Sequence, residues 1–164
     1  MSPAANGRNE RREHHILAGW LLFYHERKKE LEEKRQVLLG SLTPGSIVKA
    51  QNGHNKKITD PVASVGMKLA ELQKEEQWLK LVEDIEKSLP LKRLTFLLLR
   101  REYRYNRGRK GWTVHVQRRF AAEMAKRTGQ SEEDAWLSSR ETFWRWWNDI
   151  LLFGIGMAKG RGLL

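Results

Sequence analysis

The sequence predicts an all-α protein in two parts: a long helical hairpin over residues 1–89 and a bundle of shorter helices over residues 90–164. Three observations lead to this prediction. Apolar residues recur at three- and four-residue steps along most of the 164 residues, which is the period of an amphipathic helix. Clusters of proline, glycine and serine interrupt the pattern only at a few places, where helices end. The charge also changes along the chain, since the first part holds 15 basic and 13 acidic residues and the second holds 16 and 7.

The N-terminal part predicts two long helices. Residues 9–39 keep the helical period and end at Gly40, and the loop at 41–60 is rich in glycine, asparagine and lysine. A second helix begins near Pro61, because a proline at the first helical position loses no hydrogen bond, and it runs to Leu89. Such a hairpin buries its apolar stripes either within one chain or against a second copy, and both arrangements stay open.

The C-terminal part predicts a third helix over 91–105, in which Leu94, Leu97 and Leu98 face inward before Arg100, Arg101 and Arg104. A basic turn, NRGRKG, follows at 106–111. A fourth helix covers 114–127, with Val116, Phe120, Ala121 and Met124 on one side, and it stops at Gly129. Ser131 is then placed to cap a short extra turn that ends near Leu137.

The last predicted helix runs from Ser138 to about Ala158, and the final GRGLL is expected to fray. Ser138 and Glu141 have the spacing of a capping box. At 100° per residue, the core face carries Phe143, Trp147, Ile150 and Leu151, with Trp144 and Trp146 on the flanks. The opposite, hydrophilic arc carries Glu141, Thr142, Arg145, Asn148 and Asp149.

Composition excludes several classes of protein and favours one partner. The chain has no cysteine, so disulfides and thiolate metal sites are excluded. No stretch has the roughly 18 to 20 apolar residues of a membrane span, and the polar N-terminus lacks a secretory apolar core, so a protein of the cytoplasm is expected, with no membrane partner. The net charge of +11 is concentrated between Lys92 and Arg127, where 12 basic residues stand against two acidic ones. Such a field attracts polyanions, and nucleic acid is the leading partner.

The last two long helices suit duplex DNA as a helix-turn-helix. Arg145 has the fork that matches a guanine edge, and Thr142 offers a hydroxyl and a methyl group. Ser138, Ser139 and Arg140, at the start of the last helix, suit a phosphate. The predicted DNA-binding residues are Ser139, Arg140, Thr142, Arg145 and Asn148 in the last helix, Arg118, Arg119, Lys126 and Arg127 in the fourth, and Arg107, Arg109 and Lys110 in the basic turn. The alternative from the pattern alone is an ordinary helical bundle whose last helix is rich in tryptophan.

Three motifs resemble the phage late-gene transcriptional regulators of the RinA/ArpU type. They are NKKITDPVASVGMKLAE at 55–71, the leucine-rich helix LKRLTFLLLRREYRY at 91–105, and SSRETFWRWWNDILLFGIGMAKGRGL at 138–163. The last is similar, position by position, to the family's S-R-x-T-F-x-R-W register. The resemblance covers most of residues 10–164.

The resemblance implies a C-terminal half similar to region 4 of bacterial sigma factors, which binds promoter DNA and turns on late or packaging genes in the host cytoplasm. Ser139, Arg140, Thr142 and Arg145 fall on its reading positions, and Phe143, Ile150 and Leu151 on its core positions. Trp146 is the family's usual tryptophan. The chain departs from the family in its longer turn at 129–137, in Trp144 and Trp147 where the family has tyrosine and arginine, and in its apolar tail, LLFGIGMAKG.

Two further functions compete with a regulator. A small terminase subunit joins a helix-turn-helix to oligomerisation helices and marks phage DNA for packaging, and it predicts a ring instead of a monomer or dimer. A sigma-like factor would bind host RNA polymerase through its long helices. An enzyme is not expected, and neither is a cofactor or metal: His14, His15 and His25 do not share one helix face, and no nucleophile elbow or phosphate loop is present.

Overall fold

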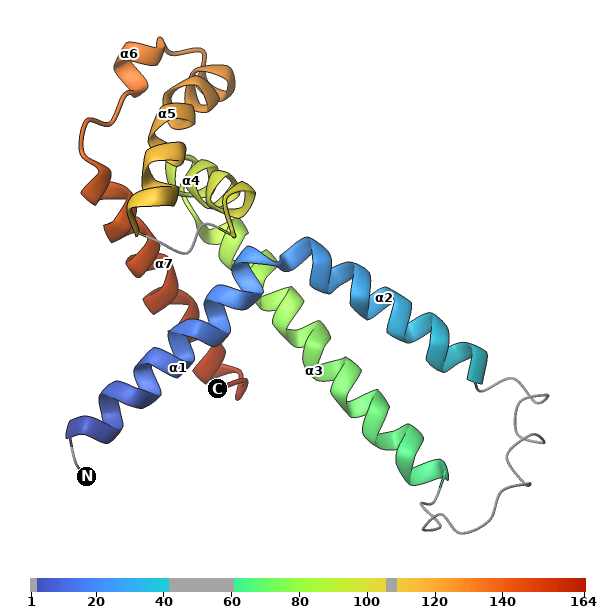
Figure 1. Cartoon of the computed structure of the whole chain (residues 1–164). Helices are drawn as coiled ribbons and strands as arrows, with labels where there is room; N and C mark the ends of the chain where they lie inside the picture. The colour runs from blue at the N-terminus through green and yellow to red at the C-terminus, as the bar shows by residue number, and fades with distance from the viewer. Residues whose placement is uncertain (1–2, 42–60, 106–108) are drawn as a thin grey trace.

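Helices make up all the regular structure in the part of the chain that the structure describes. This computed structural model describes the backbone of residues 3–41, 61–105 and 109–164. Its helices are α1 (Pro3–Leu22), α2 (Tyr24–Ser41), α3 (Pro61–Ser88), α4 (Leu91–Glu102), α5 (Arg109–Thr128), α6 (Glu132–Ala135) and α7 (Arg140–Gly160). The predicted all-α class is confirmed (Figure 1).

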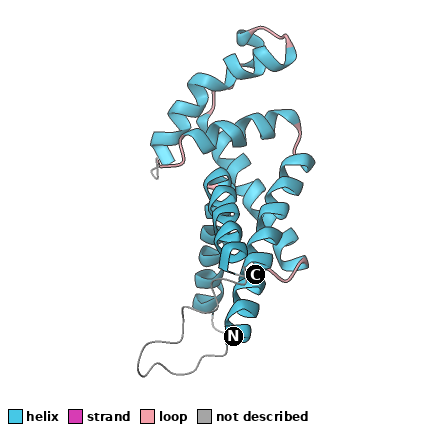
Figure 2. Ribbon diagram, turned by 90° about the vertical axis from the view of Figure 1, so that its right-hand side faces the viewer, coloured by secondary structure: helices cyan, strands magenta, loops and turns pink. Residues whose placement is uncertain are grey.

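The helices form a body with one projecting arm. The antiparallel pair α2 and α3 makes the arm, while α4, α5 and α6 gather at the other end of the molecule (Figure 1). α7 runs from that end down to α1, which crosses its C-terminal half (Figure 1). Figure 2 shows the same helices from the side, with loops only between them. α7 therefore packs against helices from both parts of the chain.

The single helix predicted over residues 9–39 is wrong, because the chain bends at Phe23. The bend remains helically bonded: the Phe23 amide donates to the Gly19 carbonyl at 3.2 Å, and the Arg27 amide donates to the Phe23 carbonyl at 2.9 Å. Beside it, Nε of Arg101 donates to the Leu21 carbonyl at 2.6 Å. A side chain that enters the carbonyl ladder is a known cause of a helix kink. The bend sends α1 across α7 and α2 along α3.

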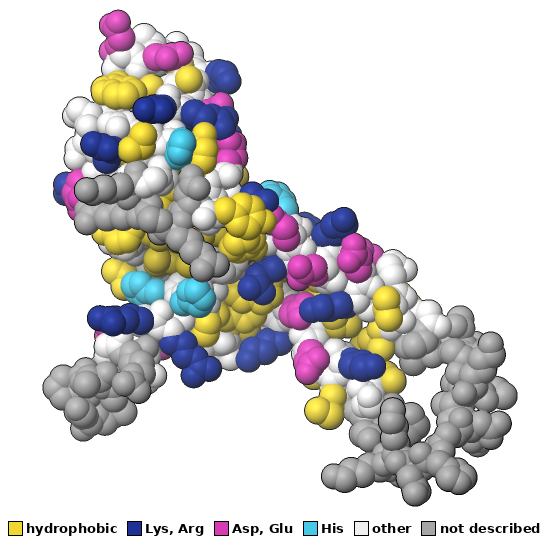
Figure 3. Space-filling view, in the orientation of Figure 1, with side chains coloured by type: hydrophobic (Ala, Val, Ile, Leu, Met, Phe, Trp, Pro, Cys, Tyr) yellow, Lys and Arg dark blue, Asp and Glu magenta, His cyan; other side chains and the backbone are white. Residues whose placement is uncertain are grey.

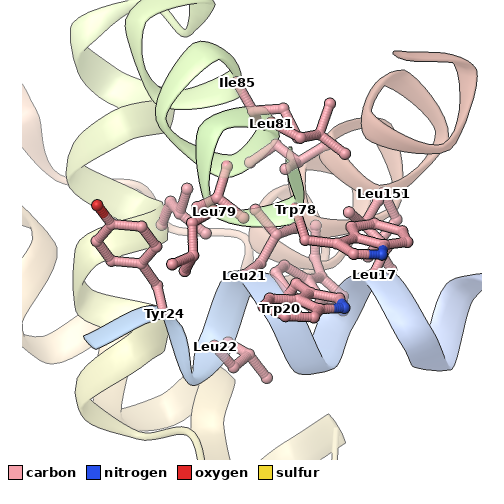
Figure 4. Packing of buried hydrophobic residues seen from close by; sticks show 14 of the residues in the cluster. Leu17, Trp20, Leu21, Leu22, Tyr24, Trp78, Leu79, Leu81, Ile85 and Leu151 are labelled. Carbon is pink, nitrogen blue, oxygen red and sulfur yellow. The ribbon is translucent and has the colours of Figure 1, made fainter. Parts of the chain in front are cut away.

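The core of the body lies where α1, α3 and α7 meet. The Trp20 and Trp78 rings stack with centroids 5.5 Å apart and planes 2° from parallel, and Leu17, Leu81 and Ile85 are fully buried (Figure 4). Gly154 of α7 is needed here: a Cβ at this position would lie 2.6 Å from Leu17 Cδ2 and 2.9 Å from Ile85 Cδ1. The glycine therefore lets α7 approach α1 and α3 closely.

The boundary proposed at residues 89 and 90 falls between α3 and α4, and Pro90 directly precedes α4. One hydrophobic cluster nevertheless contains buried residues from both sides of this boundary. The division into two domains stays a prediction, since α7 packs on α1 and α3 as well as on α4 and α5.

The predicted fraying of the C-terminus is wrong. After α7 ends, Gly162 adopts φ +67°, the left-handed conformation that glycine adopts without strain. The Gly162 amide donates to the Lys159 carbonyl and the Leu163 amide to the Ala158 carbonyl, both at 3.0 Å. This is the Schellman pattern of helix termination. Leu163 is buried as its apolar partner, so the end of the chain is held against the fold.

Candidate nucleic-acid interface

The N-terminal half of α7 is fixed by an aromatic cluster drawn from three helices. Phe143, Trp147, Ile150 and Leu151 are buried, as predicted for the core face, and Trp144 and Trp146 are half-buried, as predicted for the flanks. The Phe143 ring lies 5.8 Å from Phe96 of α4 and 5.3 Å from Phe120 of α5. The Trp146 ring meets Phe96 edge-on at 5.9 Å. One side of α7 is thus packed against α4 and α5, and its opposite side faces outward.

Arg100 lies inside this assembly instead of on a basic surface. Only 5% of it is exposed, and its guanidinium lies 4.7 Å from the Trp112 ring centre and 5.4 Å from that of Trp147. Its Nη1 donates to the Tyr103 carbonyl at 2.8 Å. Burial lowers the pKa of Arg100 to about 10, because the charged form loses its hydration. The two indole faces replace part of that hydration.

Two more arginines of the basic segment have internal roles. Arg101 is buried and forms an ion pair with Glu86 in addition to its bond to Leu21. Arg104 forms an ion pair with Glu26 at the start of α2. Part of the positive charge counted between residues 92 and 127 therefore joins α4 and the residues just after it to the N-terminal helices, where it is already paired.

The start of α7 differs from the prediction. Ser139, not Ser138, is the N-cap, and its side chain makes no capping bond, so the predicted capping box of Ser138 and Glu141 is wrong. The reason lies in α5: the Gln117 amide donates to the carbonyls of Leu137 and Ser138, both at 2.9 Å. These bonds hold Ser138 outside the helix. The Ser139 hydroxyl has no hydrogen-bond partner among the described residues.

The outer side of α7 is open where the base-reading residues were predicted. Ser139, Arg140 and Arg145 are exposed, and Thr142 and Asn148 are half-buried at its edges. Neither Arg140 nor Arg145 forms an ion pair with any described residue. The neighbouring Asp149 is engaged elsewhere, because Arg93 of α4 donates to it at 3.0 Å. Both cations are therefore available to an external anion.

The basic residues of α5 fall into two groups. Arg118 is exposed, has no ion pair with a described residue, and directly follows Gln117, whose side chain contacts the carbonyls just before α7. Arg119 pairs with Glu102 and with Glu123, and Lys126 lies 3.3 Å from Glu123. Lys126 and the exposed Arg127 are about 12 Å farther along α5, at 1.5 Å per residue. Lys126 and Arg127 therefore lie farther along α5 from Gln117, which contacts the start of α7, than Arg118 does.

Three predicted residues cannot be placed on this surface. Arg107 lies outside the described residues, and so do the side chains of Arg109 and Lys110, although both belong to the first turn of α5.

The connection between α5 and α7 carries the predicted extra turn. Gly129 ends α5 with φ +72°, and the Ser131 hydroxyl accepts a bond from the Asp134 amide at 3.2 Å, so both predicted signals are confirmed. The connection spans residues 129–139, which is longer than the three or four residues of a helix-turn-helix turn. The helix-turn-helix arrangement itself stays a prediction.

Other kinds of site have little support within the described residues. No group of three or more histidine, aspartate or glutamate side chains is placed to hold a metal ion in the part of the chain described. The His115 ring is half-buried and stacks on Tyr103 with centroids 4.7 Å apart. Among the helices described, none has the length and apolar character to cross a membrane.

Sequence reasoning missed the residues that position the site. Gln117 and Arg93 act across 20 and 56 residues respectively, and nothing in their local sequence marks them.

Comparison with known proteins found no matching family model, no matching curated protein and no matching solved structure.

Proposed function

We propose that the protein is a sequence-specific double-stranded DNA-binding regulator that activates phage late or packaging genes in the host cytoplasm. The observation that carries the proposal is the open side of α7, where Arg140 and Arg145 are exposed without ion pairs to described residues while the aromatic side of the helix is anchored. The resemblance of residues 138–163 to the RinA/ArpU-type regulators points to the same helix.

The proposed contacts follow from the positions of the side chains. Arg145 reads a guanine edge in the major groove, with Thr142 and Asn148 beside it. The Ser139 hydroxyl and Arg140 bind a backbone phosphate at the start of α7, and the exposed Arg118 of α5 adds a phosphate contact. Arg127 adds a phosphate contact farther along α5, whereas Arg119 and Lys126 contribute less because Glu102 and Glu123 already neutralise them.

The experiment measures affinity for a selected site and for random duplex DNA as salt is raised. With about three phosphate contacts, from Arg118, Arg127 and Arg140, affinity should fall roughly 40-fold between 50 and 200 mM salt. Affinity that hardly changes over this range rules out the proposal.

Single substitutions separate base reading from phosphate binding. Arg145→Ala should reduce the binding free energy for the selected site by about 1–3 kcal/mol and leave the affinity for random DNA nearly unchanged. Arg118→Ala should reduce the affinity for both DNAs alike. Arg119→Ala is a matched control, because its charge is already paired, and it should have the smaller effect. Equal losses on both DNAs from Arg145→Ala would make that residue a phosphate contact and remove the proposed sequence readout.

Two readouts distinguish the competing functions. A small terminase subunit would form a ring in solution, whereas a regulator would not. A factor that acts mainly through host RNA polymerase would bind its promoter only when polymerase is present.

A further inference from the structure

One ion pair joins α4 to the outer side of α7. Nη2 of Arg93 donates to Oδ2 of Asp149 at 3.0 Å, and the two residues are 56 positions apart in the chain. Along the α2–α3 arm, acidic and basic side chains lie next to one another (Figure 3), and pairs between them link the two helices of the arm. The Arg93–Asp149 pair differs from these because it lies beside residues proposed to contact DNA.

Asp149 follows Arg145 by four residues on the same side of α7. This spacing separates the two residues by about 6 Å along the helix and about 40° around it. An arginine and an aspartate at such a spacing are neighbours that can form an ion pair. Arg145 nevertheless has no ion pair with a described residue. Asp149 therefore stands between two possible partners, and the one it binds is Arg93.

The ion pair matters for where the charges lie more than for stability. The side chains of Arg93 and Asp149 are 37% and 49% exposed, and pairs this exposed add little to the free energy of unfolding. Without Arg93, the Asp149 carboxylate would attract the Arg145 guanidinium and repel nearby phosphates. Glu141, one turn before Arg145, already has an interaction of its own.

We propose that Arg93 is a positioning residue for DNA recognition. By binding Asp149, it keeps this carboxylate away from Arg145 and leaves the Arg145 guanidinium free for a guanine edge. Arg93 acts through Asp149 and needs no contact with a base. The inference rests on the proposed function, because it takes Arg145 as the residue that reads the base.

The test combines two substitutions and measures affinity for the selected site. Arg93→Ala should lower this affinity about three- to tenfold, and by less than Arg145→Ala does, because the freed carboxylate competes for Arg145. Asp149→Asn alone should not lower it. The double variant Arg93→Ala/Asp149→Asn should return to within about twofold of the native affinity, because the amide that replaces the carboxylate is uncharged.

Lys92→Ala supplies a matched control. Lys92 is the preceding residue of α4, is exposed, and has no ion pair with a described residue, so its removal takes away the same charge. Its effect on affinity should be smaller than that of Arg93→Ala, and Asp149→Asn should not reverse it. Thermal unfolding should differ little among these variants, since all three positions are exposed or partly exposed.

Three results would overturn the inference. A loss from Arg93→Ala that Asp149→Asn does not reverse would make Arg93 a phosphate contact. Equal losses from Arg93→Ala and from Asp149→Asn alone would make the pair a structural link between α4 and α7. Native affinity in Arg93→Ala, with a loss in Arg145→Ala, would remove the role of Arg93 and leave the proposed function standing.

A measurement on the free protein separates the inference from DNA binding. In Arg93→Ala, the Nε proton of Arg145 should exchange with water more slowly than in the native chain, because a charge-assisted bond to Asp149 protects it. The spectrum of Arg145→Lys identifies the signal, and Asp149→Asn should restore the native rate. An unchanged rate in Arg93→Ala would contradict the inference whatever the protein binds.

Discussion

Replacing Gly154 by alanine tests how closely α7 packs on α1 and α3. The added methyl group would lie 2.6 Å from Leu17 Cδ2 and 2.9 Å from Ile85 Cδ1, both in fully buried side chains. Overpacking of this kind lowers the free energy of unfolding by about 1–3 kcal/mol. The better helix propensity of alanine offsets up to about 1 kcal/mol of this loss. The free energy of unfolding should therefore fall by about 1–2 kcal/mol, and for a chain of this length Tm should fall by about 2–8 °C.

Gly156 supplies a matched control on the same helix. It is exposed, and a Cβ built there meets nothing within 4 Å. Gly156→Ala should raise Tm by about 1–4 °C, because only helix propensity changes. Thermal and urea unfolding of both variants measure the difference. An equal rise for Gly154→Ala and Gly156→Ala would refute the close approach of the three helices.

The packing also predicts the sign of a double-mutant cycle. Leu17→Ala removes the atom that the new methyl group would strike, although it destabilises the protein by about 2–5 kcal/mol alone. Gly154→Ala should therefore cost less in the Leu17→Ala background than in the native chain. A cost that is unchanged by Leu17→Ala would mean that the strain lies elsewhere.

Three further predictions concern polar contacts. The Tyr24 hydroxyl donates to Glu83 at 2.5 Å, and this bond, with the nearby Lys28, lowers the pKa of the Glu83 carboxyl. Tyr24→Phe should lower the free energy of unfolding by about 1 kcal/mol at pH 7. This loss should shrink as pH falls through the folded pKa of Glu83, so a loss that does not change with pH in urea unfolding would contradict the linkage. Arg101→Lys keeps the charge but cannot bond both Leu21 and Glu86. It should lower the free energy of unfolding by about 2–4 kcal/mol. The control, Arg118→Lys at an exposed position, should change the free energy of unfolding by less than about 0.5 kcal/mol. Gln117→Glu loses both donor bonds to the carbonyls of Leu137 and Ser138; hydrogen exchange should become faster at residues 138–142, and unchanged protection there would show that Gln117 does not position the start of α7.

Local signals in the sequence predicted much of the fold. Pro61 marks the start of α3, Gly129 and Ser131 mark the end of α5 and the start of α6, and the arcs of α7 are buried and exposed as its periodicity predicted. Each of these signals depends on residues within a few positions of one another, which is the range over which helix geometry acts.

Contacts between distant residues account for what the sequence did not predict. The bend at Phe23 is accompanied by a bond from Arg101, 80 residues away, and the start of α7 depends on Gln117. Arg100 looked like surface charge because its indole partners, Trp112 and Trp147, come from other helices. The end of the chain is different: Gly162 followed by Leu163 is a local termination signal that was present in the sequence.

The passage of α7 through both halves of the molecule affects any attempt to study them separately. A fragment that ends at residue 89 would lose the part of α7 that lies against Leu17 and Ile85, and the complementary fragment would lose the packing of α1 and α3 on α7. Because α7 packs on helices from both parts of the chain, it ties the surface that carries Arg145 to the helices from which the arm projects.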